Sequence, residues 1–251
     1  MAQAPARDDA AWKQYFDWFQ QGDLEANTPQ RYRAKLIGDG MTEAQADERL
    51  ALLVRLSRDH QSDFAALFFN RIYAAPAAQF NTQPNAFLVR TTADFTPGAA
   101  LDVAMGQGRN ALYLASKGWQ VTGFDVAEKG LDLAQAEAAR RGLHITTVKS
   151  SYVDFDYGHE RWNLIVLSYA WVPLVDPAFI ERVRDSLRPG GLIVIEHPAE
   201  DPAGSRDPRD GVNALLKAWS GGFRILHYED TEGQWDWRIR KARVLRLLAQ
   251  K

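Results

Sequence analysis

The sequence predicts an α/β fold built on a doubly wound, mostly parallel seven-stranded sheet. From Gly98 onward, short β-branched and aromatic runs alternate with helical segments, which is typical of βαβ units around a parallel sheet. The last two β-like runs have no helix between them, so we expect an antiparallel C-terminal hairpin. The first sixty or so residues have helical spacing instead. These observations predict a Rossmann-like domain over residues 63–251 and an N-terminal helical extension over residues 1–62.

The composition excludes several classes of function. The 251 residues include no cysteine, which rules out disulfides, thiolate nucleophiles, zinc–thiolate sites and cysteine-held iron–sulfur clusters. A net charge of −2 provides no electrostatic footprint for nucleic acid or an anionic membrane, and neither is an expected partner. Because no apolar run approaches the roughly 20 residues that span a bilayer and the N-terminus lacks a signal core, we expect a cytoplasmic protein.

Capping signals define the N-terminal helices. Thr28 followed by Pro29 predicts a helix start, and the capping box of Thr42 and Gln45 opens a long amphipathic helix through about Asp59. A helix over 11–21 carries an aromatic stripe, which favours core packing or a homodimer interface over a lid above a substrate pocket. The stripe consists of Trp12, Tyr15, Phe16 and Phe19, and the apolar face of the long helix is predicted to contain Leu50, Leu53, Val54 and Leu56.

The sheet and its helices follow from the alternation of the two periodicities. Strands are predicted at 99–103, 120–124, 145–148, 162–167 and 191–196. Helices are predicted at 63–75, 110–116, 127–140 and 176–187, the last three ending near Gly118, Gly142 and Gly190, as helices prefer. The final strands are predicted at 223–228 and 242–248, joined by a turn over 229–233.

A glycine turn at 106–108 lies between the first strand and the next helix. Missing side chains let the backbone approach a ligand there, and the helix N-terminus offers N–H donors. Asp102, at the end of the first strand, is placed to hold the amides of the loop near a cationic ligand centre. Asp125 ends the next strand, where an acid accepts hydrogen bonds from ribose hydroxyls; its structural alternative is a helix N-cap. Together these features predict a site for an adenosine-containing ligand.

The same residues resemble the motifs of class I S-adenosylmethionine (SAM)-dependent methyltransferases. Segment 101–110 is similar to their first motif, Asp125 to the acid of their second strand, and the run 187–191 (Leu-Arg-Pro-Gly-Gly) to their turn into strand five. The Gly-x-Gly-Arg-Asn loop and the final strands are most similar to the tellurite-resistance and thiopurine-type small-molecule methyltransferases. The likeness extends from about Phe80 to the C-terminus. It implies SAM as the cofactor and a small molecule as the methyl acceptor.

The resemblance also assigns cofactor contacts to positions of this chain, namely Asp102, Ala104, Met105, Gly106, Gly108, Asn110, Asp125, Val126, Ser151 and Tyr169. Two of these positions depart from the common pattern. Ala104 replaces a glycine, which predicts an ordinary backbone conformation and slightly less room beside the ligand. Ser151 stands where an acid often contacts the adenine amino group, so we expect adenine to be held through serine hydroxyl and backbone groups.

Methyl transfer from a sulfonium chiefly requires in-line alignment and exclusion of water, and orientation supplies about 7–11 kcal/mol of a barrier. A base matters only if the acceptor begins protonated. Ligands of open α/β sheets lie beyond the carboxyl ends of the strands, where Tyr169, Trp171, Glu196 and His197 fall. His197 is the candidate base because imidazole titrates near neutral pH, and its alternative is a loop histidine before Pro198. Tyr169 is a candidate for shaping the surroundings of the methyl group or for packing.

Several further residues are candidates for the walls of the site. Asn81, Asn85 and Phe87 precede the first strand at a distance that lets this segment fold over the cofactor, and Trp235 and Trp237 fall in the C-terminal hairpin. Core packing is the alternative for each aromatic residue. No histidines have metal-ligand spacing, so no metal is expected.

Two other functions stay open at this point. A nicotinamide-dependent oxidoreductase is one, because Gly106-x-Gly108-x-x-Ala111 also fits the dinucleotide-binding pattern. A non-catalytic SAM-binding protein is the other, because Ala104 and Ser151 depart from the common pattern. Asp102 in the strand and the C-terminal hairpin favour the methyltransferase.

Overall fold

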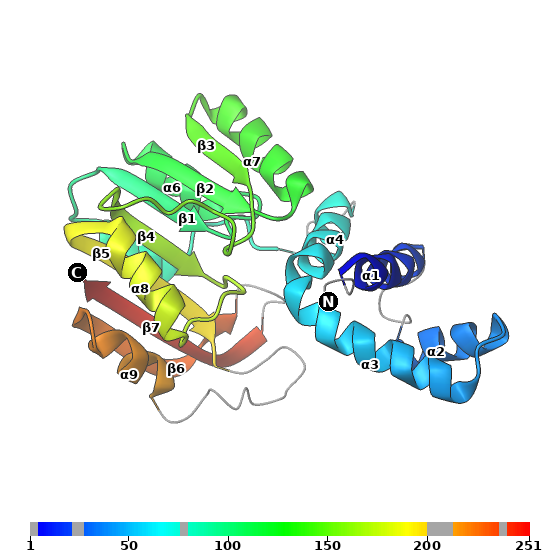
Figure 1. Cartoon of the computed structure of the whole chain (residues 1–251). Coiled ribbons are helices and arrows are strands. Elements are labelled where there is room, and N and C mark those ends of the chain that lie inside the picture. The colour runs from blue at the N-terminus through cyan, green and yellow to red at the C-terminus, as the bar shows by residue number, and fades with distance from the viewer. Residues whose placement is uncertain (1–4, 22–27, 76–79, 200–212, 236–239) are drawn as a thin grey trace. The chain divides into compact units, whose positions relative to one another are not determined.

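The computed structural model describes residues 5–21, 28–75, 80–199, 213–235 and 240–251 (Figure 1). The chain divides into two compact units, Met1–Phe68 and Phe69–Lys251. Helix α4 (Gln61–Ala74) contributes residues to both units. None of the helices in the described ranges is long and apolar enough to cross a membrane.

The N-terminal unit contains helices α1 (Pro5–Gln20), α2 (Pro29–Gly38), α3 (Glu43–Asp59) and the beginning of α4. Both capping predictions are confirmed. The Thr28 side chain accepts a hydrogen bond from the Arg31 N–H, and Thr42 and Gln45 form a reciprocal capping box. The buried core of this unit is formed by Trp12, Tyr15, Tyr32, Leu36, Ala46 and Leu53.

The aromatic stripe of α1 packs within its own unit. Trp12 and Tyr15 are buried, and the rings of Phe16 and Phe19 have centroids 5.7 and 5.0 Å from that of Phe64. The predicted apolar face of α3 is wrong at Val54, which is 61% exposed. The buried face centres on Leu53, and the next residue of a helix is turned away from it by about 100°.

The second unit is built on a seven-stranded sheet in the order β3-β2-β1-β4-β5-β7-β6. The first five strands are parallel, β7 runs antiparallel to β5, and β6 runs antiparallel to β7. The strands are β1 (Ala99–Val103), β2 (Gln120–Asp125), β3 (Ile145–Lys149), β4 (Trp162–Ser168), β5 (Leu187–Pro198), β6 (Arg224–Trp235) and β7 (Arg240–Gln250). The predicted fold class is confirmed. Because β2 and β4 flank β1, the order of strands reverses there, and open α/β sheets bind their ligands beyond the carboxyl ends of the strands at such a point.

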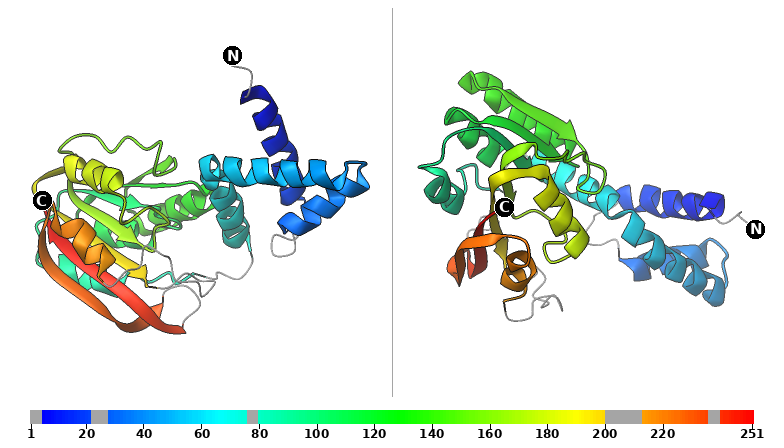
Figure 2. Two further views of the ribbon diagram at one scale, coloured as in Figure 1. Left: turned by 60° about the horizontal axis from the view of Figure 1, so that its bottom comes forward. Right: turned by 60° about the vertical axis from the view of Figure 1, so that its left-hand side comes forward.

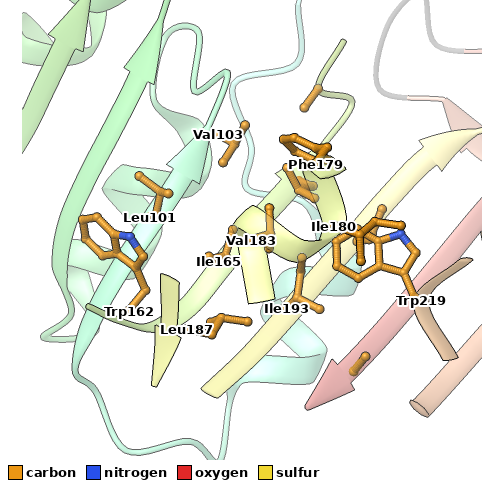
Figure 3. Close-up of a cluster of buried hydrophobic side chains, with 14 of the residues drawn as sticks. Leu101, Val103, Trp162, Ile165, Phe179, Ile180, Val183, Leu187, Ile193 and Trp219 are labelled. Atoms are coloured by element: carbon orange, nitrogen blue, oxygen red, sulfur yellow. The ribbon is translucent and has the colours of Figure 1, made fainter. Parts of the chain in front are cut away.

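Helices cover both faces of this sheet (Figures 1 and 2). Helices α5 (Ala86–Thr92), α6 (Arg109–Ser116) and α7 (Glu128–Arg141) share one buried cluster, and α8 (Pro177–Ser186) and α9 (Ala214–Ser220) share the other. The period-two alternation of strand side chains explains the division, since Leu164 and Val166 belong to the first cluster and Ile165 to the second. Figure 3 shows the second cluster, in which side chains of α8 and Trp219 of α9 pack against the sheet.

The position predicted for the C-terminal turn is wrong. Residues 229–233 lie within β6 and pair with residues 242–246 of β7. Their charged side chains, which suggested a turn, make cross-strand ion pairs instead. Asp230 Oδ1 accepts from Arg243 Nε at 2.5 Å, and Glu229 Oε2 accepts from Arg246 Nη1 at 2.9 Å. The antiparallel pair itself is confirmed.

Two local boundaries also differ from the prediction. Helix α8 ends at Ser186, one residue before its predicted end, and β5 begins at Leu187 rather than at residue 191, because Leu187 already pairs with Trp162 of β4. Gly190, with φ +77°, lies in the irregular first part of β5. The short helices α5 and α9 were not predicted, since each has only seven residues and offers little periodicity.

Candidate cofactor and active site

A tight loop leads from the carboxyl end of β1 into α6. Gly106 and Gly108 adopt φ values of +53° and +77°, which glycine reaches without a Cβ clash. The N–H of Met105 donates to the Phe124 carbonyl at 2.9 Å and thereby fixes the loop. Ala104 has a φ of +54°, so the predicted ordinary backbone is wrong. The chain must turn at once after the strand, and this conformation costs a non-glycine residue about 1–2 kcal/mol.

Asp125, at the end of β2, holds this loop. Its Oδ2 accepts a hydrogen bond from the Gly106 N–H at 2.8 Å, and its Oδ1 accepts from the Ala127 N–H at 2.8 Å. Burial raises the pKa of the carboxyl, and the backbone N–H groups of Ala127, Gly106 and Val126 oppose the rise. One oxygen therefore binds the N–H of Ala127, the N-cap residue of α7, and the other fixes the glycine loop, while the contact with ribose stays a prediction. Each carboxylate oxygen has a further lone pair that can accept from a ligand hydroxyl.

Asp102 has a different structural role from the predicted one. Its Oδ2 accepts from the Ala111 N–H at 3.0 Å, so it holds the first turn of α6, whereas the amide of Gly106 is held by Asp125. Burial raises the pKa of Asp102 to about 7, and the Arg109 guanidinium acts in the opposite direction. The side chain is 2% exposed. A cationic ligand centre nearby would favour the ionised carboxylate.

The segment before α5 lies along the glycine loop. Gln107 Nε2 donates to the Asn81 carbonyl at 3.3 Å, and the Asn85 N–H donates to Asn110 Oδ1 at 2.9 Å. The side chain of Asn110, a predicted cofactor contact, thus anchors this segment. Phe87 is buried in the core, which agrees with core packing, the alternative to a wall of the site.

Glu196, at the end of β5, is the centre of a buried polar network. Its Oε1 accepts from Asn85 Nδ2 at 2.6 Å and from the Tyr169 hydroxyl at 3.0 Å. Its Oε2 accepts from Arg246 Nε at 2.6 Å. Tyr169, which follows β4, has a φ of +56°, a conformation that costs a non-glycine residue about 1–3 kcal/mol. The network therefore holds Tyr169 in a strained position at the carboxyl edge of the sheet.

His197 follows Glu196 in β5, so its side chain lies on the opposite face of the strand. Its Nδ1 is 2.9 Å from the Pro198 carbonyl oxygen. Because a carbonyl oxygen only accepts, Nδ1 is the donor in this contact.

Two other predicted cofactor contacts, Ser151 and Met105, have local structural roles. The Ser151 hydroxyl donates to Asp154 Oδ2 at 2.6 Å and accepts from the Asp154 N–H at 3.2 Å, so it closes a turn after β3. Met105 packs against the sheet, since a Cβ added to Gly123 would lie 2.3 Å from its sulfur. The side chain of Trp235 and the whole of residue 237 lie outside the described residues.

Two residues beside the glycine loop were missed by the sequence analysis. Arg109 Nη1 donates to the Gln83 carbonyl at 3.3 Å and Nη2 to Ser168 Oγ at 3.4 Å, linking the loop to the end of β4. The position of Arg109 in the Gly-x-Gly-Arg-Asn run could have indicated this residue from the sequence. Tyr73 of α4 lies against Gly106, and nothing in the local sequence indicates this long-range contact.

Comparison with known proteins agrees with this geometry. Residues 100–191 match the methyltransferase domain family. A ubiquinone biosynthesis O-methyltransferase of Cereibacter sphaeroides is 30% identical over 95 residues, covering 38% of each chain. A probable SAM-dependent methyltransferase of Haemophilus influenzae, TehB, is 26% identical over 147 residues, covering 55% of this chain and 50% of its own. The chain therefore spans about half or less of the length of these curated relatives.

A solved structure extends the likeness in fold. The N-methyltransferase NodS of Bradyrhizobium japonicum WM9, in complex with S-adenosylhomocysteine (SAH), has a TM-score of 0.56 and 18% identity, covering 74% of this chain and 98% of its own. Residues 100–191 therefore match a methyltransferase domain, and the strand order supports the class I SAM-dependent type. Over 147 residues the chain is similar to TehB.

Proposed function

We propose that this protein transfers a methyl group from SAM to a small-molecule acceptor. The observation that carries the proposal is the hydrogen bond from the Gly106 N–H to Asp125 Oδ2 at the carboxyl edge of the sheet. It holds a glycine loop, whose backbone a ligand can approach, next to a carboxylate with acceptor capacity for ribose hydroxyls. SAM, when bound, supplies an electrophilic methyl group on a cationic sulfur.

The residues fit such a cofactor. Asp125 is suited to accept from ribose, and the buried Asp102, one strand away, would supply negative charge when a cationic centre favours its ionised form. The strained Tyr169 borders the position expected for the acceptor, and its hydroxyl proton is engaged by Glu196. Tyr169 therefore acts by shape and orientation rather than as a base. His197 is the base in this proposal, acting on acceptors that begin protonated.

Calorimetric titration with SAM, SAH and NAD tests the cofactor. We expect binding of the first two and none of NAD; the reverse result would replace the proposal with an oxidoreductase. Release of SAH during incubation with a panel of small acceptors then separates an enzyme from a non-catalytic SAM-binding protein. His197→Ala is expected to lower turnover mainly for acceptors that are protonated at the assay pH. Full turnover of this variant across the pH range would remove His197 from the mechanism.

The location, the partners and the oligomeric state of the enzyme belong to the same proposal. We propose a cytoplasmic enzyme without nucleic-acid or membrane partners, and the charge of −2 supports the absence of these polyanionic partners. The N-terminal helices are proposed to form a homodimer interface, since Phe16, Trp18 and Phe19 are only partly buried within their unit. Light scattering coupled to gel filtration measures the mass, and a monomer at all concentrations would exclude the dimer.

A further inference from the structure

The end of α4 is attached to the glycine loop and to the start of α7. Asn70 Oδ1 accepts from the Lys129 N–H at 2.9 Å. Helix α7 has no side-chain cap at its own N-cap residue, Ala127, so Asn70 supplies an acceptor for its first turn from a distant part of the chain. Asn70 belongs to the same compact unit as α7.

One turn further along α4, Tyr73 is wedged between two glycines. A Cβ added to Gly106 would lie 2.2 Å from the Tyr73 hydroxyl oxygen, and one added to Gly130 would lie 2.9 Å from the edge of its ring. Gly130 lies in the first turn of α7, where glycine costs about 0.5–1 kcal/mol relative to alanine. The close approach of Tyr73 gives a physical reason for glycine at this position, because any side chain would meet the ring.

The phenol of Tyr73 lies in the field of the two acids that define the cofactor site. Burial, chiefly, and the charge of Asp125 raise its pKa, and Asp102 adds to the rise, while Arg109 and the Gln107 N–H oppose it. The hydroxyl is therefore neutral at physiological pH and able to donate a hydrogen bond. The ring of Phe80, 5.2 Å from that of Tyr73, extends the aromatic surface.

We propose that Tyr73 is a cofactor-binding residue, which forms the roof of the SAM site above Gly106 and donates a hydrogen bond to the bound cofactor. This inference rests on the proposed function. A ligand that lies across Gly106 and reaches Asp125 must pass beside Tyr73. The Tyr73 hydroxyl lies against Gly106, and it also lies in the field of the Asp125 carboxylate. The ring excludes water from that side of the cofactor.

The dissociation constant of SAH for the full chain tests this role. Tyr73→Ala is expected to raise it about tenfold or more, and Tyr73→Phe, which keeps the ring, about 2- to 10-fold. Gly130→Ala, which adds a methyl group under the ring, is also expected to raise it while Tyr73 is retained. The matched control is Tyr113→Ala on α6, a half-buried tyrosine for which no change is expected.

The alternatives give distinct results. If wild-type protein binds SAH and Tyr73→Ala binds it equally well with only a lower melting temperature, Tyr73 is a packing residue and the inference is overturned. Tighter binding by Tyr73→Ala would make Tyr73 an obstruction and also overturn it. If wild-type protein binds neither SAM nor SAH, the proposed function itself fails. Should Tyr73→Ala not fold, Tyr73→Phe and Gly130→Ala decide the question.

Discussion

Arg246 Nε lies 2.6 Å from Glu196 Oε2, and the two side chains are only 18% and 4% exposed. Their backbones are opposite one another in the antiparallel β5–β7 pair. The ion pair therefore joins the C-terminal strand to the end of β5. There Glu196 also accepts hydrogen bonds from the side chains of Asn85 and Tyr169. Strand β7 thus contributes to the stability of the carboxyl edge of the sheet, where the candidate site lies.

Arg246→Met tests this relationship. Removing one partner leaves the buried Glu196 carboxylate without its cation, so we expect the free energy of unfolding to fall by about 2–4 kcal/mol. Urea unfolding measures the change. Lys149→Met, which breaks an exposed pair with Glu128 (59% and 63% exposed), should cost less than about 1 kcal/mol. Equal losses in the two variants would show that burial does not set the strength of the Glu196 pair.

Asp125→Asn should damage both the loop and cofactor binding. An amide nitrogen cannot accept a hydrogen bond, so either the Gly106 or the Ala127 N–H loses its partner. We expect a stability loss of about 1–3 kcal/mol and a rise of about tenfold or more in the dissociation constant of SAM. Asp156→Asn is the control, because that exposed side chain accepts from the local Gly158 N–H and lies outside the glycine loop. Unchanged SAM affinity in Asp125→Asn would contradict the site assignment.

The pH dependence of stability should reveal Asp102. Burial raises its pKa in the folded state from 3.8 to about 7, so the folded chain holds a proton that the unfolded chain has lost. Stability from this group is present at low pH and falls as pH rises toward about 7, by about 4 kcal/mol in total. Asp102→Asn cannot ionise, so its stability relative to wild type should increase between about pH 4 and pH 7. A relative stability that is independent of pH would indicate an ordinary pKa.

Ala104→Gly should stabilise the protein by about 0.5–1 kcal/mol. Glycine relieves the left-handed strain at φ +54°, and the gain exceeds the added entropy of the unfolded chain. Ala115→Gly, in the regular helix α6, should instead destabilise by about 0.5–1 kcal/mol. Thermal unfolding of the two variants measures the difference. Destabilisation by both would mean that the Ala104 methyl group packs more favourably than its backbone strain costs.

Local signals predicted most of the secondary structure correctly. The limits of β1 were predicted without error, and those of β2, β3 and β4 within one residue, because each strand is a short β-rich run. The turn over 229–233 was wrongly placed, because the charged residues of this segment fit the composition of a turn as well as that of a strand. Their pairing with β7 is visible only when both strands are in place.

The sequence by itself determined the strand–helix alternation, the caps at Thr28 and Thr42, and the glycine loop followed by Asp125, because these depend on residues near one another in the chain. Only the tertiary structure decided the rest. Tyr73 lies against Gly106, and Glu196 binds the side chains of Asn85 and Arg246. Ala104 adopts a left-handed backbone conformation. These features depend on contacts between distant segments, and the energy of such contacts overrides the preference of a single residue.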